Sequence, residues 1–184
     1  MKKIGFISGS LRKDSISTKI AHNLAKLLPE GYEPVFIEIG DLPLYNEDLE
    51  AATPLAYTRF RNEVKGLDGV IFVTPEYNRS FTAALKNALD VGSRPYGQNV
   101  WSGKAALIVS QSPGQFGGFG ANHHLRQVLV MFNMLTVAQP EVYLSNSAKL
   151  LDEDGNLNNE GTIKFLQGAV NTFIKYVEVA PKLV

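Results

Sequence analysis

The stretch KKIGFISGSLRKDSISTKIAHNLAKLLPEG, residues 2–31, begins with a short apolar run and ends with an amphipathic pattern. Residues 3–8 are almost continuously apolar, which is typical of a strand in a parallel sheet that is covered on both faces. Between residues 16 and 28 the apolar residues recur at helical spacing, and Pro29 and Gly31 end this pattern. A strand, a loop and a helix in this order predict one βα unit.

The same unit recurs along the chain at intervals of about 30 to 35 residues, the length of one βα repeat. Further strands are expected at residues 34–39, 69–74, 105–110 and 135–138, and further helices near residues 53–67, 80–89, 125–132 and 163–177. We expect Thr53 and Pro54 to begin the second helix and Ser80 to cap the third.

Five strands alternating with five helices predict an α/β three-layer sandwich, because right-handed crossovers place helices on both faces of a parallel sheet. Five strands favour the flavodoxin-like order 2-1-3-4-5 over a six-stranded dinucleotide-binding fold. A length of 184 residues is typical of one domain, so we expect residues 1–184 to form a single flavodoxin-like domain. Ligands of such a sheet bind beyond the carboxyl ends of the strands, so the loops there decide function.

Composition narrows the function classes. Eighteen basic and eighteen acidic residues give zero formal net charge, so nucleic acid and membrane surfaces are not expected partners. The chain has no cysteine, which excludes disulfides, iron–sulfur clusters and cysteine nucleophiles, and any redox chemistry needs a bound cofactor. The apolar run at the N-terminus is too short for a signal peptide, and no run is long enough to span a membrane. We therefore expect a cytoplasmic protein.

The first loop, residues 9–18, combines a glycine with two cations and several hydroxyl residues. The N-terminus of a helix presents free N–H groups and the positive end of the helix dipole, so this loop predicts a site for a phosphate monoester. The alternative is that Ser15 or Ser17 only caps the helix while Arg12 and Lys13 are solvated. The residues by themselves leave both interpretations open.

The second loop, residues 74–80, has the sequence TPEYNRS. Pro75 restricts the backbone, Tyr77 offers a flat face, and the Asn78 amide offers two donors and an acceptor. This loop follows the third strand and lies beside the first loop at the switch point of the sheet, so it suits a planar heteroaromatic ligand. A turn followed by a helix cap would explain Pro75, Asn78 and Ser80 one by one.

The third loop, residues 110–120, has the sequence SQSPGQFGGFG, and its glycines allow the backbone to approach a ligand closely. Phe116 and Phe119 either line a substrate site or pack beneath the loop. His123 and His124 follow at the start of a helix, where a structural or subunit-contact role is favoured over catalysis. No spacing of ligands predicts a metal site.

Other phosphate-binding and catalytic motifs are absent. The Gly103-Lys104 pair precedes a strand and is followed by alanine, which does not match a Walker loop. The first loop has no G-x-G-x-x-G fingerprint, and the chain has no G-x-S-x-G nucleophile elbow. The third strand ends in Thr74-Pro75 rather than in the phospho-accepting aspartate of a receiver domain.

Together the loops resemble a known family. The motifs are Gly9-Ser10-Leu11-Arg12 with Ser15 and Ser17, then Pro75-Glu76-Tyr77-Asn78, and then Leu85-Lys86-Asn87-Ala88-Leu89-Asp90. With them, the chain resembles the NADPH-dependent FMN reductase family of flavodoxin-like quinone, chromate and azo-dye reductases. The similarity also takes in Gly103-Lys104 and Leu125-Arg126-Gln127, and so covers nearly the whole chain.

The resemblance implies a non-covalent FMN, with NADPH or NADH as co-substrate. The positions that match the family's phosphate site are Ser10, Arg12, Ser15 and Ser17, and those that match its flavin-ring site are Pro75, Glu76, Tyr77, Asn78 and Arg79. The third loop closes on the flavin in the family, through Ser110, Gly114, Gly117 and Gly118. No catalytic side chain is implied, because the flavin carries the chemistry while Tyr77, Asn78 and Arg79 orient or tune it.

The sequence departs from the family pattern at three positions. Relatives often have asparagine where Ser17 stands, an aromatic or polar residue where Arg79 stands, and tryptophan where Val91 stands. A serine can still donate to a phosphate, so the first departure does not affect the expectation of FMN. The other two bear on the choice of substrate.

The function that the resemblance implies is an FMN-dependent NAD(P)H oxidoreductase. It would pass a hydride from a nicotinamide through bound FMN to a small electrophilic acceptor such as a quinone, an azo compound or a metal oxyanion. The alternatives are a flavodoxin-type electron carrier and a flavin-binding redox sensor without steady-state turnover. Arg12 and the zero net charge argue against the electron carrier.

The resemblance also implies a homodimer and leaves open whether two dimers pair into a tetramer. The two helices that form the contact in relatives correspond here to segments that hold Ala83, Ala84, Leu85, Val91, Leu125, Val128 and Met131. We expect this apolar surface to exceed what one face of the sheet can cover. The alternative is that all of it belongs to the core.

Overall fold

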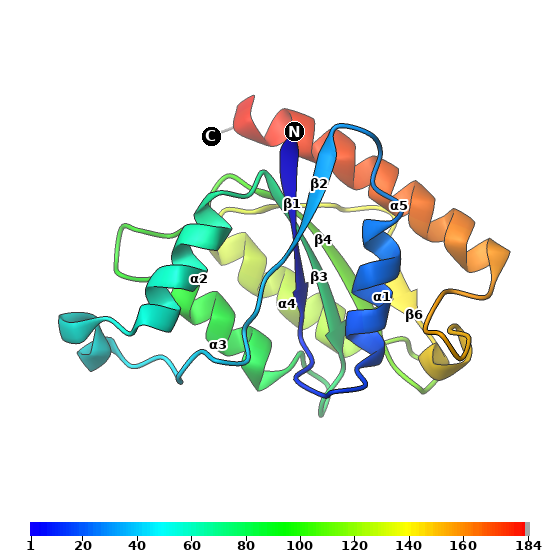
Figure 1. The fold of residues 1–184 in the computed structure, drawn as a ribbon, viewed down its shortest axis with the longest axis horizontal. Helices are drawn as coiled ribbons and strands as arrows, with labels where there is room; N and C mark the ends of the chain where they lie inside the picture. Colours follow the sequence, from blue (N-terminus) through cyan, green and yellow to red (C-terminus); the bar gives the residue numbers. More distant parts are fainter. Residues whose placement is uncertain (183–184) are drawn as a thin grey trace.

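A parallel sheet with helices on both faces forms the centre of the molecule in the computed structural model, which describes residues 1–182 (Figure 1). The last two residues of the expected domain 1–184 lie outside the described residues. The strands are β1 (Lys2–Ser8), β2 (Tyr32–Phe36), β3 (Gly69–Pro75), β4 (Ala105–Gln111), β5 (Leu135–Thr136) and β6 (Val142–Leu144). The α-helices are α1 (Ile16–Ala25), α2 (Leu55–Lys65), α3 (Ala83–Gly92), α4 (Phe119–Met131) and α5 (Glu160–Val179). Three short 3₁₀ helices, at Glu47–Ala52, Ser147–Lys149 and Ala180–Lys182, complete the described elements.

The strand order β2-β1-β3-β4-β5 confirms the predicted flavodoxin-like topology. The prediction of one continuous fifth strand at 135–138 is wrong, because that edge of the sheet consists of two short strands. β5 pairs with the start of β4, and β6 pairs with its end. Pro140 lies between them and has no N–H group to donate, so it interrupts the ladder of hydrogen bonds.

Two hydrophobic cores lie on opposite faces of the sheet. In the middle strand β3, Val70 and Phe72 pack into the core under α2, α3 and α4, whereas Ile71 and Val73 pack into the core under α1 and α5. All seven residues of β3 are buried, and so are all seven of β4. This explains why the strands are apolar on both faces rather than alternating.

The N-terminal caps of α1 and α3 can be compared with those expected from the sequence. Ser15 caps α1 by accepting a hydrogen bond from the Thr18 N–H group at 3.1 Å. The expected cap at Ser80 is wrong, because Thr82 caps α3 instead, and its Oγ1 atom accepts from the Leu85 N–H group at 3.3 Å. Ser80 is part of a tight turn that ends before the helix begins.

The second helix starts one residue later than expected. Pro54 is the N-cap and α2 begins at Leu55, so Thr53 gives no cap hydrogen bond to the helix. Within residues 1–182, no helix has both the length and the apolar character that crossing a bilayer requires.

Candidate functional site

The first and second loops meet at the carboxyl edge of the sheet, where β1 and β3 lie side by side. The Gly9 N–H group donates to the Val73 carbonyl at 2.8 Å, and the Thr82 hydroxyl donates to the Gly9 carbonyl at 2.5 Å. A Cβ atom on residue 9 would lie 2.8 Å from Oγ1 of Thr74, so only glycine allows this close approach. The predicted meeting of the two loops at the switch point is therefore present in the fold.

A hollow of about 340 Å³ lies between these two loops. It is lined by Gly9, Leu11, Arg12, Tyr77, Thr82, Ala83 and Ala84. Tyr77 is 51% exposed, and the exposed guanidinium of Arg12 makes no hydrogen bond or ion pair with any residue among 1–182. The hollow thus combines a free cation from the first loop with a flat aromatic face from the second.

The four predicted phosphate residues separate into two pairs. Ser10 is partly exposed and Arg12 is exposed, whereas Ser15 and Ser17 are buried at 3% and 0% exposure. Ser15 is occupied in capping α1, and the Ser17 hydroxyl oxygen accepts a hydrogen bond from Nε2 of Gln111 at 2.9 Å. In this structure Ser10 and Arg12 face the outside of the loop, while Ser15 and Ser17 hold the loop from within.

Gln111 is a residue that the sequence reasoning missed. Its side chain connects the first turn of α1 to the end of β4, and its Oε1 atom accepts from the Ser147 hydroxyl at 2.5 Å. Ser17, Gln111 and Ser147 are all buried. Because 94 positions separate Ser17 from Gln111 along the chain, no local pattern indicates this contact.

The second loop forms a tight turn. The backbones of Tyr77 and Ser80 exchange both hydrogen bonds, at 2.8 and 3.0 Å. Asn78 and Arg79, at the centre of the turn, have φ angles of 50° and 69°, as in the two-residue turns that join hairpin strands. This backbone conformation is common for asparagine and uncommon for arginine. The turn lifts Tyr77, Asn78 and Arg79 to the surface, where all three are exposed.

Pro75 and Glu76 have supporting positions beneath this turn. Pro75 is buried at the end of β3, where it lies opposite Gln111 of β4. The Glu76 carboxylate accepts a hydrogen bond from the Ala121 N–H group at 3.0 Å, in the first turn of α4. A negative charge is favourable at a helix N-terminus. Glu76 therefore fastens the second loop to α4, which is an orienting role.

The third loop folds back on β4 and β6, and three of its four predicted cofactor-binding residues, Ser110, Gly117 and Gly118, are buried. Ser110 has no exposed surface, and its hydroxyl lies 2.9 Å from the Gly117 carbonyl oxygen and 3.2 Å from that of Val142. Gly117 and Gly118 are buried at φ angles of 58° and 79°. Cβ atoms there would lie 2.7 Å from the Tyr143 carbonyl carbon and 2.9 Å from Cβ of Ser110. Only Gly114 among the four predicted residues is exposed.

The aromatic residues and histidines near this loop have structural contacts. Phe116 is 75% exposed, whereas the ring of Phe119 lies 4.3 Å from that of His123. Nε2 of His123 lies 2.9 Å from the Tyr143 hydroxyl, and Nδ1 of His124 lies 2.8 Å from the Ser80 hydroxyl. These contacts join α4 to β6 and to the second loop.

Two further observations bear on acid–base and metal chemistry here. Burial and a hydrogen bond to Glu141 raise the pKa of Tyr143 above its ordinary value, so this phenol stays protonated. Among residues 1–182, no group of three or more His, Asp or Glu side chains is placed to hold a metal ion.

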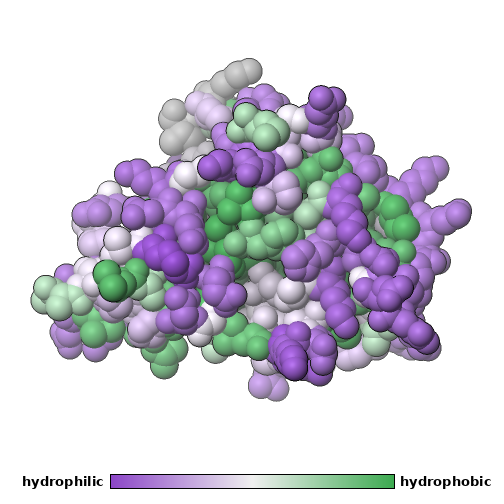
Figure 2. All heavy atoms as spheres, in the orientation of Figure 1, coloured by the Kyte–Doolittle hydropathy of each residue, from purple (hydrophilic) through white to green (hydrophobic). Residues whose placement is uncertain are grey.

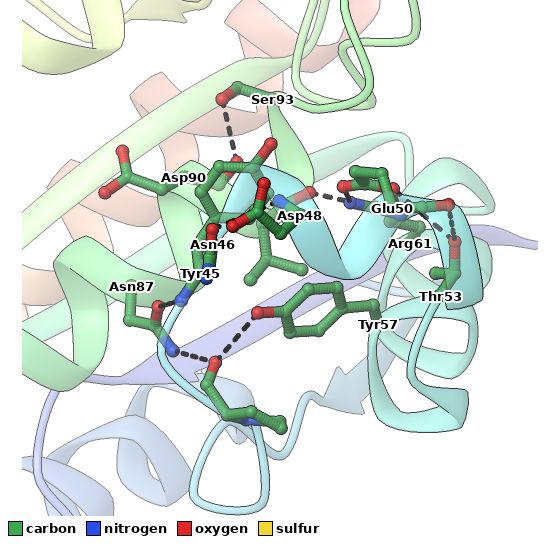
Figure 3. A network of polar contacts seen from close by, with 12 residues as sticks. Tyr45, Asn46, Asp48, Glu50, Thr53, Tyr57, Arg61, Asn87, Asp90 and Ser93 are labelled. Carbon is green, nitrogen blue, oxygen red and sulfur yellow. Dashed lines mark hydrogen bonds and ion pairs between the residues drawn. The ribbon is translucent and has the colours of Figure 1, made fainter.

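The connection that follows β2 is anchored on α3, and Figure 3 shows the contacts. The Asn87 side chain accepts from the Tyr45 N–H group at 2.8 Å and donates to the Pro43 carbonyl at 2.9 Å. The Tyr57 hydroxyl donates to the same carbonyl at 3.2 Å. Asn87, which belongs to the motif at residues 85–90, is therefore a structural residue that fixes this connection beside the site.

The donor set of the site fits FMN. A phosphate monoester needs a cation, hydroxyl groups and free N–H groups, and the first loop supplies Arg12, Ser10 and the N-terminus of α1. A flat ring needs an apolar or aromatic wall next to the phosphate, and Leu11, Tyr77 and Ala83 supply it in the same hollow.

Comparisons with known proteins point to the same cofactor. The family model described as NADPH-dependent FMN reductase matches residues 2–149. A quinone reductase from Pseudomonas putida is 51% identical over 177 residues, covering 96% of this chain and 95% of that protein. A 2-hydroxy-1,4-benzoquinone reductase from a Burkholderia species is 41% identical over 95% of this chain and 96% of its own length.

A solved structure agrees with these sequence relatives. The flavoenzyme NAD(P)H:(acceptor) oxidoreductase FerB from Paracoccus denitrificans superimposes with a TM-score of 0.91 at 40% identity, over 97% of this chain and 98% of that one. The chain therefore belongs to the NADPH-dependent FMN reductase family and is an FMN-dependent NAD(P)H oxidoreductase.

Proposed function

We propose that this chain is a single flavodoxin-like FMN-binding domain that reduces quinones with electrons from NADH or NADPH. The observation that carries the proposal is the hollow between Arg12 and Tyr77, which is open at the carboxyl edge of the sheet. Curated relatives that are named as quinone reductases support the choice of acceptor.

The side chains around the hollow would divide the work of holding the cofactor. Arg12, Ser10 and the first N–H groups of α1 would bind the phosphate, whereas Tyr77, Asn78 and Arg79 would lie along the ring. Glu76 and Thr82 would keep the two loops in register through their contacts with Ala121 and Gly9. When bound, FMN supplies the ability to accept a hydride from a nicotinamide and to pass electrons to an acceptor.

The rim of the hollow supports a flat, weakly polar acceptor. Leu11 is 60% exposed and Tyr77 is 51% exposed, so both present apolar surface beside the site. Such a rim gains free energy by covering a quinone ring, whereas a metal oxyanion would gain little from it. Among the three acceptor classes, we therefore place quinones before azo compounds and metal oxyanions.

Steady-state turnover tests this proposal. We expect the purified protein with FMN to oxidise NADH or NADPH when a benzoquinone is added, more rapidly than with an azo dye or chromate. Apo-protein provides the control for direct, uncatalysed reduction. If the flavin is reduced once but no acceptor restores turnover, the protein is an electron carrier or sensor, and the proposal is wrong.

We also propose a cytoplasmic homodimer, although only some of the residues expected from the sequence, Met131 among them, lie at the surface. Leu85, Val91 and Leu125 are fully buried in the core, so the expectation that they form surface is wrong. On the same face of the sheet, Val130 is 69% exposed and Met131 is 82% exposed. These two side chains on α4 support a contact with a second copy.

Oligomeric state is measured by light scattering. We expect a dimer at micromolar concentration, with an interface near or above about 1,600 Å², the size of a specific stable contact. Met131→Asp should shift the protein toward the monomer, whereas Lys175→Asp on α5, on the opposite face of the sheet, should not. A monomer with full reductase activity would contradict the dimer.

A further inference from the structure

A second hollow, of about 220 Å³, lies between α1 and the end of β2, at the same edge of the sheet as the candidate flavin site. The side chains that matter for its chemistry are Ser8, Ser10, Thr18, His22, Phe36 and Glu38. A water molecule occupies about 30 Å³ in the liquid, so this space is large enough for a ring system.

One wall of the hollow is aromatic. The rings of His22 and Phe36 lie 4.2 Å apart, and Phe36 in turn stacks on the buried Phe6 at 5.3 Å. Phe36 is an edge-strand residue that is 44% exposed, although it is large and apolar. In Figure 2, apolar side chains gather in the middle of this face of the molecule, with polar ones around them. Exposed rings of this kind bind planar heteroaromatic groups by stacking.

The other wall is polar. The Thr18 hydroxyl donates to the Ser8 hydroxyl at 2.9 Å. Oε1 of Glu38 accepts a hydrogen bond from the Gly40 N–H group at 2.8 Å, which fixes the carboxylate just beyond the end of β2. A carboxylate held at the end of the second strand accepts hydrogen bonds from the hydroxyl groups of a ribose in dinucleotide-binding sheets.

The two hollows are neighbours. Leu11 lines both of them, and Ser10 lies at the edge of the second one. Lys13 in the first loop, which is not among the groups assigned to the FMN phosphate, is an exposed cation. A molecule with an aromatic group at each end and a negatively charged centre therefore matches the path from Tyr77, across the first loop, to Phe36.

We propose that the hollow between α1 and β2 binds the adenosine half of the nicotinamide co-substrate, with Glu38 accepting hydrogen bonds from the ribose. This proposal rests on the proposed function and deepens it. The carboxylate would repel the 2′-phosphate of NADPH, so the protein should prefer NADH. Arg59 donates to the Glu38 carbonyl, but its charge is already paired with Asp41 and Glu63, so it does not offset this repulsion.

The first test is steady-state kinetics of the FMN-loaded enzyme with each nicotinamide. Glu38→Gln should raise the KM for NADH about tenfold, as expected for loss of a charge-assisted hydrogen bond, and should leave kcat unchanged. The same variant should reduce the preference for NADH over NADPH, since the repulsion is removed. Phe36→Leu should raise both KM values. Glu33→Gln is the matched control, because Glu33 is an exposed carboxylate on β2 that lies outside the hollow. This variant should leave the KM values for NADH and NADPH unchanged.

The second test uses adenosine, which has no phosphate and so does not compete for the FMN phosphate site. Adenosine should bind the FMN-loaded protein in a calorimetric titration, inhibit competitively with NADH, and bind more weakly to Glu38→Gln than to Glu33→Gln. Turnover with NADH combined with no binding of adenosine and unchanged KM values would overturn this proposal alone. Binding of adenosine without turnover would support the hollow and contradict the proposed function.

Discussion

The first and third loops both contain serine and glycine, but they differ in whether their side chains have partners inside the protein. The first loop has three serines and one glycine, the third has two serines and four glycines, and both follow a buried strand at the same edge of the sheet. In the third loop, the Ser110 hydroxyl forms hydrogen bonds inside the protein. Gly117 lies against β6 and Gly118 lies against β4. In the first loop, the side chain of Arg12 has no hydrogen-bond or ion-pair partner among residues 1–182. The lesson is that a binding loop is marked by polar groups that the protein itself leaves unsatisfied, more than by residue type.

The largest effect that separates the two loops is expected for Gly118→Ala. This residue has a φ angle of 79°, and an added Cβ atom would lie 2.9 Å from Cβ of Ser110. Strain and overlap should lower the free energy of unfolding by about 3 kcal/mol, measured by urea denaturation of the apo-protein. Gly114→Ala is the control, because its added Cβ would meet only Oγ of Ser112, at 3.6 Å. Equal stability of the two variants would show that the third loop does not fold back on β4 and β6 as described.

The next largest effect is expected for Arg12→Ala in the first loop, and it should change the affinity for FMN rather than the stability of the fold. Arg12→Ala should weaken FMN binding by about 1.5–3 kcal/mol, the range for a charge-assisted hydrogen bond. Because the side chain has no internal partner, the unfolding midpoint of the apo-protein should not move. Titration of apo-protein with FMN measures the first quantity, and thermal denaturation measures the second. An unchanged affinity would mean that the backbone N–H groups alone hold the phosphate.

The smallest effect is expected for Gln111, whose side chain connects the third loop to the first through Ser17. Gln111→Leu removes the partner of the buried Ser17 and Ser147 hydroxyls, and should cost about 1.5 kcal/mol of unfolding free energy. Because Ser17 lies in the first turn of α1, the variant should also bind FMN more weakly than the wild type. Gln127→Leu, on the exposed side of α4, is the control. If Gln111→Leu lowered the free energy of unfolding but left the affinity for FMN unchanged, the hydrogen bonds of Gln111 with Ser17 and Ser147 would not position the first loop for phosphate binding.

The sheet was predictable from sequence because its signals are local. Short apolar runs, about one βα unit apart, were sufficient for the strand order. Ser15 caps α1, as one of the two interpretations of the first loop had it. The meeting of the first and second loops followed from the same order, since the carboxyl ends of β1 and β3 are neighbours. Thr82 was missed as a cap because Ser80 is a stronger local signal, and only the turn at residues 77–80 removes it from the helix.

The parts of the site that were not predictable depend on contacts between distant residues. Gly117 of the third loop is buried against β6, a strand of three residues that no pattern in the sequence marks. Asn87 was part of a recognised motif, but its contacts with Pro43 and Tyr45 join segments about 40 positions apart. The pairing of Ser17 with Gln111 likewise requires the folded sheet.

The central claim is that the first loop binds the terminal phosphate of a flavin mononucleotide. The identity of the bound flavin tests this claim most directly. The purified protein should be yellow, and denaturation followed by chromatography should release FMN, equimolar with the chain, and no FAD. A colourless protein that also fails to take up added FMN would contradict the account.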